Sequence, residues 1–145
     1  MTQQKIISLK YKNEVTEATY KEACSFQKTN PTKTMRLLKK AAHQGHPNAQ
    51  HKLSLMYYNR DGNVGEALKW ATKAAEQGVA DAQFNLGVLL LNNEADASFG
   101  GKGNLQMAYQ ELSKAFKLFQ RTNDKESQYE CEKILKGLRK ILRIP

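Results

Sequence analysis

The sequence predicts an all-helical protein, an α-α superhelix (solenoid) of about three helical hairpins closed by a C-terminal capping helix. Two observations predict it: a segment that recurs at an offset of 33 residues, and apolar residues that follow the period of a helix. Residues 41–59 read AAHQGHPNAQHKLSLMYYN and residues 74–92 read AAEQGVADAQFNLGVLLLN. The identical positions are Ala41/Ala74, Ala42/Ala75, Gln44/Gln77, Gly45/Gly78, Ala49/Ala82, Gln50/Gln83, Leu53/Leu86 and Asn59/Asn92.

Start and stop signals divide the chain into seven expected helices. Helix starts are indicated at Asn30-Pro31, His46-Pro47, Asn63 and Asn123, and left-handed C-caps at Gly45, Gly62 and Gly78. Another copy of the helix that begins near Asn63 begins near Asn104, at an offset of 41, so the extra residues fall within 94–103. The expected helices are residues 14–27, 31–44, 47–60, 64–77, 80–92, 104–120 and 123–143.

The chain is therefore divided into a short N-terminal segment (1–13) that is expected to be disordered, helical repeats (14–120) and an amphipathic, basic capping helix (121–145). The capping helix carries one apolar stripe, formed by Cys131, Ile134, Leu135, Leu138, Ile141 and Leu142. No apolar run is long enough for a transmembrane segment, and residues 1–11 lack the apolar core of a secretory signal. A cytoplasmic location is expected, with Cys24 and Cys131 as small buried hydrophobes.

The repeating units resemble Sel-one-like repeats, a relative of the tetratricopeptide repeat, over roughly residues 14–120. Two patterns carry the resemblance, A-x-x-x-L-G-x-x-Y and K-A-x-x-W-x-x-K-A-A-x-Q-G. The matching residues are Ala82, Leu86 and Gly87 for the first pattern, and Ala67, Trp70, Lys73, Ala74, Ala75, Gln77 and Gly78 for the second. Ser54 replaces the glycine of the first pattern, and Leu90 replaces its tyrosine. The resemblance implies a right-handed superhelix whose first helices line a concave face.

That implied register predicts a partner-binding surface. Its residues are His51, Leu55, Tyr58 and Asn59 from one repeat, and Phe84, Val88, Leu91 and Asn92 from the next. Because residues 80–92 are apolar nearly all round, they must be covered on more than one side. The sequence leaves three occupants open: the chain's own terminal helix, a helix or peptide of a partner protein, and a second copy in a homodimer.

The net charge of +9 is concentrated in two blocks. Residues 27–60 contain seven Lys or Arg and no acid, and residues 133–145 contain five and no acid. The helical period gathers part of each block into a basic patch, formed by Lys33, Arg36 and Lys40 and by Lys133, Lys136, Lys140 and Arg143. Such a field attracts an acidic protein, a nucleic acid or an anionic membrane. No recognised nucleic-acid motif accompanies it, and neither patch has interleaved aromatic residues.

No catalytic constellation emerges from the sequence. His43, His46 and His51 lie close together, but no Cys or carboxylate stands among them to complete a metal site. Residues 100–103 read GGKG and lack the spacing and the Ser or Thr of a phosphate-binding loop, so a hairpin loop is expected there. We therefore expect no enzyme, no cofactor and no metal.

These observations predict a non-catalytic protein-protein interaction module of the adaptor, regulator or inhibitor/immunity type, from a bacterium. Its partner is expected to be another protein with an acidic surface or an amphipathic helix. The alternative is a basic nucleic-acid-binding helical protein.

Overall fold

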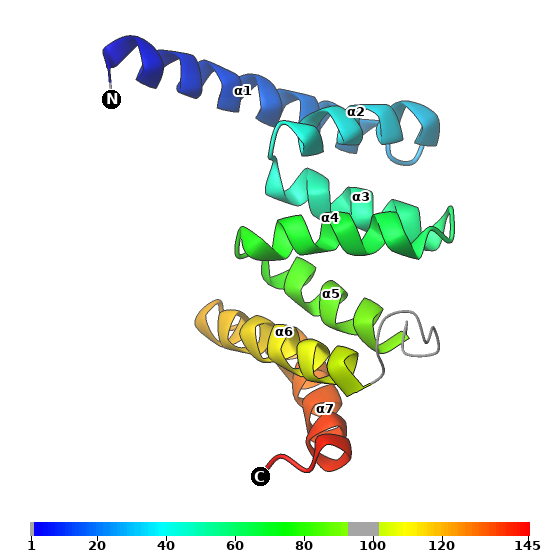
Figure 1. Cartoon of the computed structure of the whole chain (residues 1–145). Coiled ribbons are helices and arrows are strands. Elements are labelled where there is room, and N and C mark those ends of the chain that lie inside the picture. Colours follow the sequence, from blue (N-terminus) through cyan, green and yellow to red (C-terminus); the bar gives the residue numbers. More distant parts are fainter. Residues whose placement is uncertain (1, 93–101) are drawn as a thin grey trace.

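The computed structural model describes residues 2–92 and 102–145, and seven helices account for most of these residues. Figure 1 shows them stacked in one elongated array, with α1 at one end and α7 at the other. The helices are α1 (Gln3–Ser25), α2 (Pro31–His43), α3 (Pro47–Asn59), α4 (Val64–Glu76), α5 (Ala80–Asn92), α6 (Lys102–Arg121) and α7 (Lys125–Leu142). The predicted all-helical solenoid is confirmed. Of the loop predicted at residues 100–103, residues 100 and 101 lie outside the described residues, and the prediction is wrong for residues 102 and 103, which belong to α6.

Extensive packing between helices follows the order of the chain. Among the described helices, the pairs with substantial contact are each helix and its successor, from α1 and α2 to α6 and α7. Two buried clusters result: one joins α1, α2 and α3 with Trp70 of α4, and the other joins α4, α5, α6 and α7. Because a single hairpin covers only part of its own apolar surface, each must be completed by the next.

Local capping explains why α2 to α5 begin and end within one residue of the predicted limits. Asn30 Oδ1 accepts a hydrogen bond from the Lys33 N–H at 2.9 Å, and Asn63 Oδ1 accepts one from the Glu66 N–H at 3.0 Å. Gly45, Gly62 and Gly78 have φ angles of 92°, 60° and 81°, the left-handed conformation that was predicted for them.

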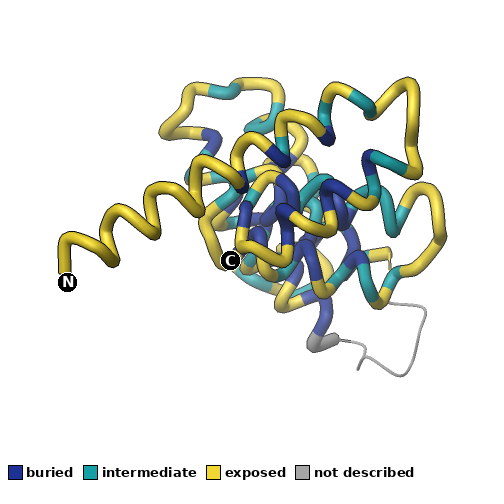
Figure 2. Tube along the Cα trace, turned by 90° about the horizontal axis from the view of Figure 1, so that it is seen from above, coloured by how far each residue is buried: buried dark blue, intermediate teal, exposed yellow. Residues whose placement is uncertain are grey.

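The start of the first helix corrects the prediction. α1 begins at Gln3 rather than at residue 14, so residues 3–13, which were expected to be a disordered segment, are helical. No Gly or Pro interrupts residues 2–25, and nothing in them stops a helix. Figure 2 shows this half of α1 projecting from the body, with its residues exposed. It has no packing partner in the described chain, and therefore no apolar stripe that would have revealed it.

The start of the last helix also differs from the prediction. Asn123, the expected start, has a φ of 58°, which Asn tolerates better than most residues. The N-cap is Asp124, whose Oδ1 accepts from the Ser127 N–H at 3.1 Å and whose Oδ2 accepts from the Ser127 hydroxyl at 2.7 Å. These hydrogen bonds favour the carboxylate and lower the pKa of Asp124.

Two glutamines, Gln50 and Gln77, connect the end of α4 with α3 and with the turn before it. Gln77 Nε2 donates to Gln50 Oε1 at 2.8 Å and to the Gly45 carbonyl at 3.0 Å. Gln83, the repeat equivalent of Gln50, has a buried Oε1 without a hydrogen-bond partner among the described residues. The position that corresponds to Gln77 in the next unit is Leu118, which has no donor. The α5–α6 hairpin therefore has no equivalent of the hydrogen bond from Gln77 to Gln50.

The packing of α5 on α6 depends instead on apolar contact at a glycine. A Cβ at Gly87 of α5 would lie 2.6 Å from Leu112 Cγ and 3.3 Å from the Ala108 carbonyl oxygen of α6. No side chain fits at this distance without a shift of Leu112 or of α6. The glycine therefore sets how closely α5 and α6 approach.

Gly87→Ala is expected to destabilise the protein by about 1–3 kcal/mol, because overpacking must push Leu112 or α6 aside. Gly137→Ala is the matched control: it lies in α7, where an added Cβ would meet no other atom within 4 Å. It should raise stability by about 0.5–1 kcal/mol through helix propensity. Urea unfolding followed by circular dichroism measures both. Equal effects of the two substitutions would contradict the close contact at Gly87.

Candidate functional site

The two predicted binding stripes lie side by side on α3 and α5. Asn92 Nδ2 donates to the Tyr58 hydroxyl at 3.2 Å, and Asn85 Nδ2 donates to the Ser54 hydroxyl at 3.2 Å. These two hydrogen bonds join the helices although neither helix follows the other directly in the chain. We call the surface formed by the eight predicted residues the α3–α5 face.

Most of the α3–α5 face is half-buried rather than free. Tyr58, Phe84 and Leu91 pack against the larger buried cluster, so their side chains already contribute to the fold. Val88 is half-buried, and Asn59 and Asn92 are exposed. The expected aromatic anchors are therefore partly used inside the chain, which limits how much of each could enter a partner.

The packing shows whether the chain's own terminal helix, one of the three possible occupants, covers the α3–α5 face. α7 packs on α6 at the end of the stack, and its buried residues Cys131, Leu135 and Leu138 belong to the cluster of α4 to α7. It has no substantial packing on the described residues of α3 or α5. α5 is covered by α4 and α6, which buries its Leu86 and Leu89. The terminal helix thus caps the stack and, in the part of the chain that the structure describes, does not cover the α3–α5 face.

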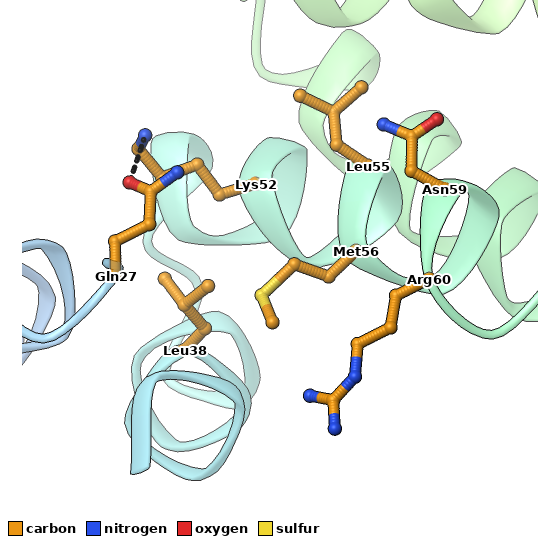
Figure 3. A pocket seen from close by; sticks show the side chains of 7 residues that line it. All are labelled: Gln27, Leu38, Lys52, Leu55, Met56, Asn59 and Arg60. Atoms are coloured by element: carbon orange, nitrogen blue, oxygen red, sulfur yellow. Dashed lines mark hydrogen bonds between the residues drawn. The ribbon is translucent and has the colours of Figure 1, made fainter. Parts of the chain in front are cut away.

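A pocket of about 260 Å³ opens beside this face. Its apolar part is formed by Leu38, Leu55 and Met56, and Figure 3 shows Met56 of α3 and Leu38 of α2 directed toward each other. Leu38 is almost completely buried and forms the floor. Two of the predicted residues, Leu55 and Asn59, line the pocket.

The polar part of the pocket is positively charged. Lys52 and Arg60 line it together with the amides of Gln27 and Asn59, and no acid is among the lining residues. Lys52 Nζ donates to Gln27 Oε1 at 3.3 Å, an uncharged partner (Figure 3). Arg60 has a loose ion pair with the neighbouring Asp61 at 3.9 Å. The site can therefore take an apolar group with a carboxylate beside it.

Sequence reasoning missed five residues of this pocket: Gln27, Leu38, Lys52, Met56 and Arg60. Lys52 stands three residues before Leu55, so helical spacing alone could have added it to the stripe. Gln27 and Leu38 come from other parts of the chain and carried no signal.

A family model described as the Sel1 repeat matches residues 25–46, 47–79 and 80–125. The chain belongs to the Sel1 repeat family. Members of this family generally act as protein-interaction modules and are typically non-catalytic. The second and third matches begin at the first residues of α3 and α5, so the helices of the α3–α5 face open Sel1 units. Neither the curated proteins nor the solved structures gave a match.

Within this Sel1 array the two basic patches lie at opposite ends, one on α2 and one on α7 (Figure 1). Folding also brings acids to them. Lys33 Nζ lies 3.3 Å from Glu22 of α1, and Lys136 Nζ lies 3.1 Å from Glu132. Both acids come from outside the acid-free blocks of the sequence, so these two lysines are partly neutralised. Arg36 and Lys40 lie on α2 outside the core, and Lys133, Lys140 and Arg143 lie at the other end.

The histidines and cysteines have structural surroundings. In the described part of the Sel1 array, no three His, Cys, Asp or Glu side chains gather as a metal site would require. His46 caps α3, because its Nδ1 accepts from the Ala49 N–H, and its Nε2 donates to Glu17 at 2.7 Å. Burial raises the pKa of the Cys131 thiol to about 11. Across residues 2–92 and 102–145, we find no helix with the length and apolar character needed to cross a membrane.

His51 is the titratable residue of the α3–α5 face whose surroundings shift its pKa. Its Nδ1 is buried without a hydrogen-bond partner among the described residues. Burial lowers the pKa of His51, Lys52 adds to the lowering and Asp81 opposes it. Because the folded state binds this proton less readily than the unfolded state, protonation of His51 favours unfolding.

The stability of the protein is expected to fall as the pH is lowered from about 7.5 to about 5.5, the range through the usual pKa of histidine. His51→Phe, which copies Phe84 at the equivalent position of the next unit, should make stability less dependent on pH in this range. Urea midpoints at several pH values measure the effect. An unchanged pH dependence in His51→Phe would contradict the assignment.

Proposed function

We propose that this Sel1 protein is an adaptor or inhibitor-type module, with a cytoplasmic location, that captures one segment of a partner protein on the α3–α5 face. The pocket of Lys52, Leu55 and Arg60 is the observation that carries the proposal. It combines apolar walls with two cations, and the adjoining face is not covered by the chain's own last helix.

The chemistry of the pocket favours an acidic peptide with an apolar side chain. An apolar side chain can enter between Leu55 and Met56, while a carboxylate beside it reaches Lys52 or Arg60. Charge-assisted hydrogen bonds to arginine and lysine are stronger than neutral ones, and positive potential speeds the encounter with an acidic partner. Both effects select the same class of ligand.

Nucleic acid suits the array less well. The basic patches lie at opposite ends of the stack, so they do not form one continuous track for a phosphate backbone (Figure 1). Glu22 and Glu132 further reduce their fields. Retention on heparin and DNA at about 50 mM salt, with a steep loss as salt increases, would favour the nucleic-acid alternative instead.

Lys52→Glu combined with Arg60→Glu is expected to weaken capture of the natural partner by about tenfold or more, because two attractive charges become repulsive. Leu55→Asp should do the same by placing a charge in the apolar part of the pocket. The measurement is affinity capture from the native host with mass spectrometry, followed by a titration of the captured protein with each purified variant.

The matched control is Arg36→Glu with Lys40→Glu, the same charge change on the outer face of α2. Circular dichroism must show every variant as helical as the wild type. Phe84→Asp is unsuitable, because Phe84 packs on the core. Capture that is lost equally in the control pair, or kept in Lys52→Glu/Arg60→Glu, would overturn the proposed site.

A further inference from the structure

A hollow of about 520 Å³ lies at the far end of the array, between α6 and α7. Its apolar surface is supplied by Tyr109, Phe116 and Leu135. Lys117 and Arg139 lie beside them, and the Arg139 Nε donates to the Tyr109 hydroxyl at 3.2 Å. We call this hollow the α6–α7 groove.

The internal repeat shows what normally fills such a groove. Adding the two repeat offsets, 33 and 41 residues, relates positions of α2 to positions of α6. The equivalent pairs are Met35/Tyr109, Ala42/Phe116 and His43/Lys117. On α2 the tryptophan of α4 packs at the His43 end of this surface. The Trp70 ring centroid lies 4.9 Å from that of His43, and Trp70 belongs to the buried cluster that includes Ala42 and against which Met35 packs.

Among the described helices, α6 packs extensively on α5 and α7 alone, so no described helix lies at the corresponding place on α6. We infer that the α6–α7 groove binds an amphipathic, acidic helix of a partner protein, which inserts one aromatic side chain where Trp70 inserts on α2. This second interaction surface is separate from the pocket on α3 and does not depend on it.

Charge selects the acidic partner. In the α6–α7 groove, Lys136 is paired with Glu132, whereas neither Lys117 nor Arg139 has an ion pair in the described structure. The groove thus keeps two uncompensated positive charges. A second copy of this chain would bring like charge to it, because the projecting half of α1 carries Lys5, Lys10 and Lys12. Like charges across an interface oppose association.

The test uses the full chain and a fluorescent peptide with the sequence of residues 63–78, in which Lys69 and Lys73 are replaced by Glu. This peptide retains the tryptophan that fills the internal groove and carries acids at both places where lysines lie over its ring. Fluorescence anisotropy should show binding to the wild type. Lys117→Glu with Arg139→Glu should weaken it by about tenfold, since two attractive pairs become repulsive. A peptide with Trp70→Ala should also bind more weakly.

Two matched charge reversals separate this surface from the others. Arg36→Glu with Lys40→Glu, and Lys52→Glu with Arg60→Glu, should both leave the affinity within about twofold of the wild type, because these residues lie on or next to α2 and α3 and do not line the groove. No binding to the wild type, or an equal loss in the α2 pair, would overturn the inference. If Lys52→Glu/Arg60→Glu alone lowered the affinity, the peptide would bind in the pocket on α3, and the inference would be overturned. If the wild type were a dimer and Lys117→Glu/Arg139→Glu a monomer, the groove would bind a second copy of the chain, and the inference would also be overturned.

Discussion

The close approach of successive helices is the constraint on which the rest of this structure depends. Among the described residues, alanine is the commonest residue of the buried core, and at Gly87 even a methyl group would collide with Leu112. Small residues allow each helix to lie in the groove of its predecessor. Since every hairpin hides only part of its apolar surface, this contact must be repeated along the stack. The sides of the array then remain available, and among the described helices none packs into the groove between α6 and α7.

The fold could be predicted from the sequence wherever its signals were local. Asn30, Asn63 and the glycines after α2 and α4 act within a few residues, and the repeat fixes which helices are equivalent. The projecting half of α1 could not be predicted, because it packs on nothing in the described chain and therefore shows no apolar stripe. The limit at Asn123 failed for a different reason: two adjacent residues, Asn123 and Asp124, can both start a helix, and only the backbone distinguishes them.

The candidate site was predictable only along a single helix. Leu55 and Asn59 share a helical face, so the sequence could identify them. The pocket beside them also needs Leu38 from α2 and Gln27 from the preceding loop, which only packing brings together. The same limit applies to charge. The block around Lys33 has no acid in the sequence, but Glu22 reaches it from α1.

The interfaces between helices differ in chemistry along the array, because single residues differ between equivalent positions of the repeats. Gln77 joins the first units by satisfying both Gln50 and the Gly45 carbonyl, whereas Leu118 leaves the Oε1 of Gln83 without a partner among the described residues. A buried acceptor that is not satisfied costs about 1–3 kcal/mol. The contact at Gly87 must offset this cost through apolar packing, which is less directional than a hydrogen bond. Amides thus connect the α3–α4 hairpin, whereas the described residues where α5 meets α6 are held by apolar packing at Gly87, next to the groove of α6 and α7.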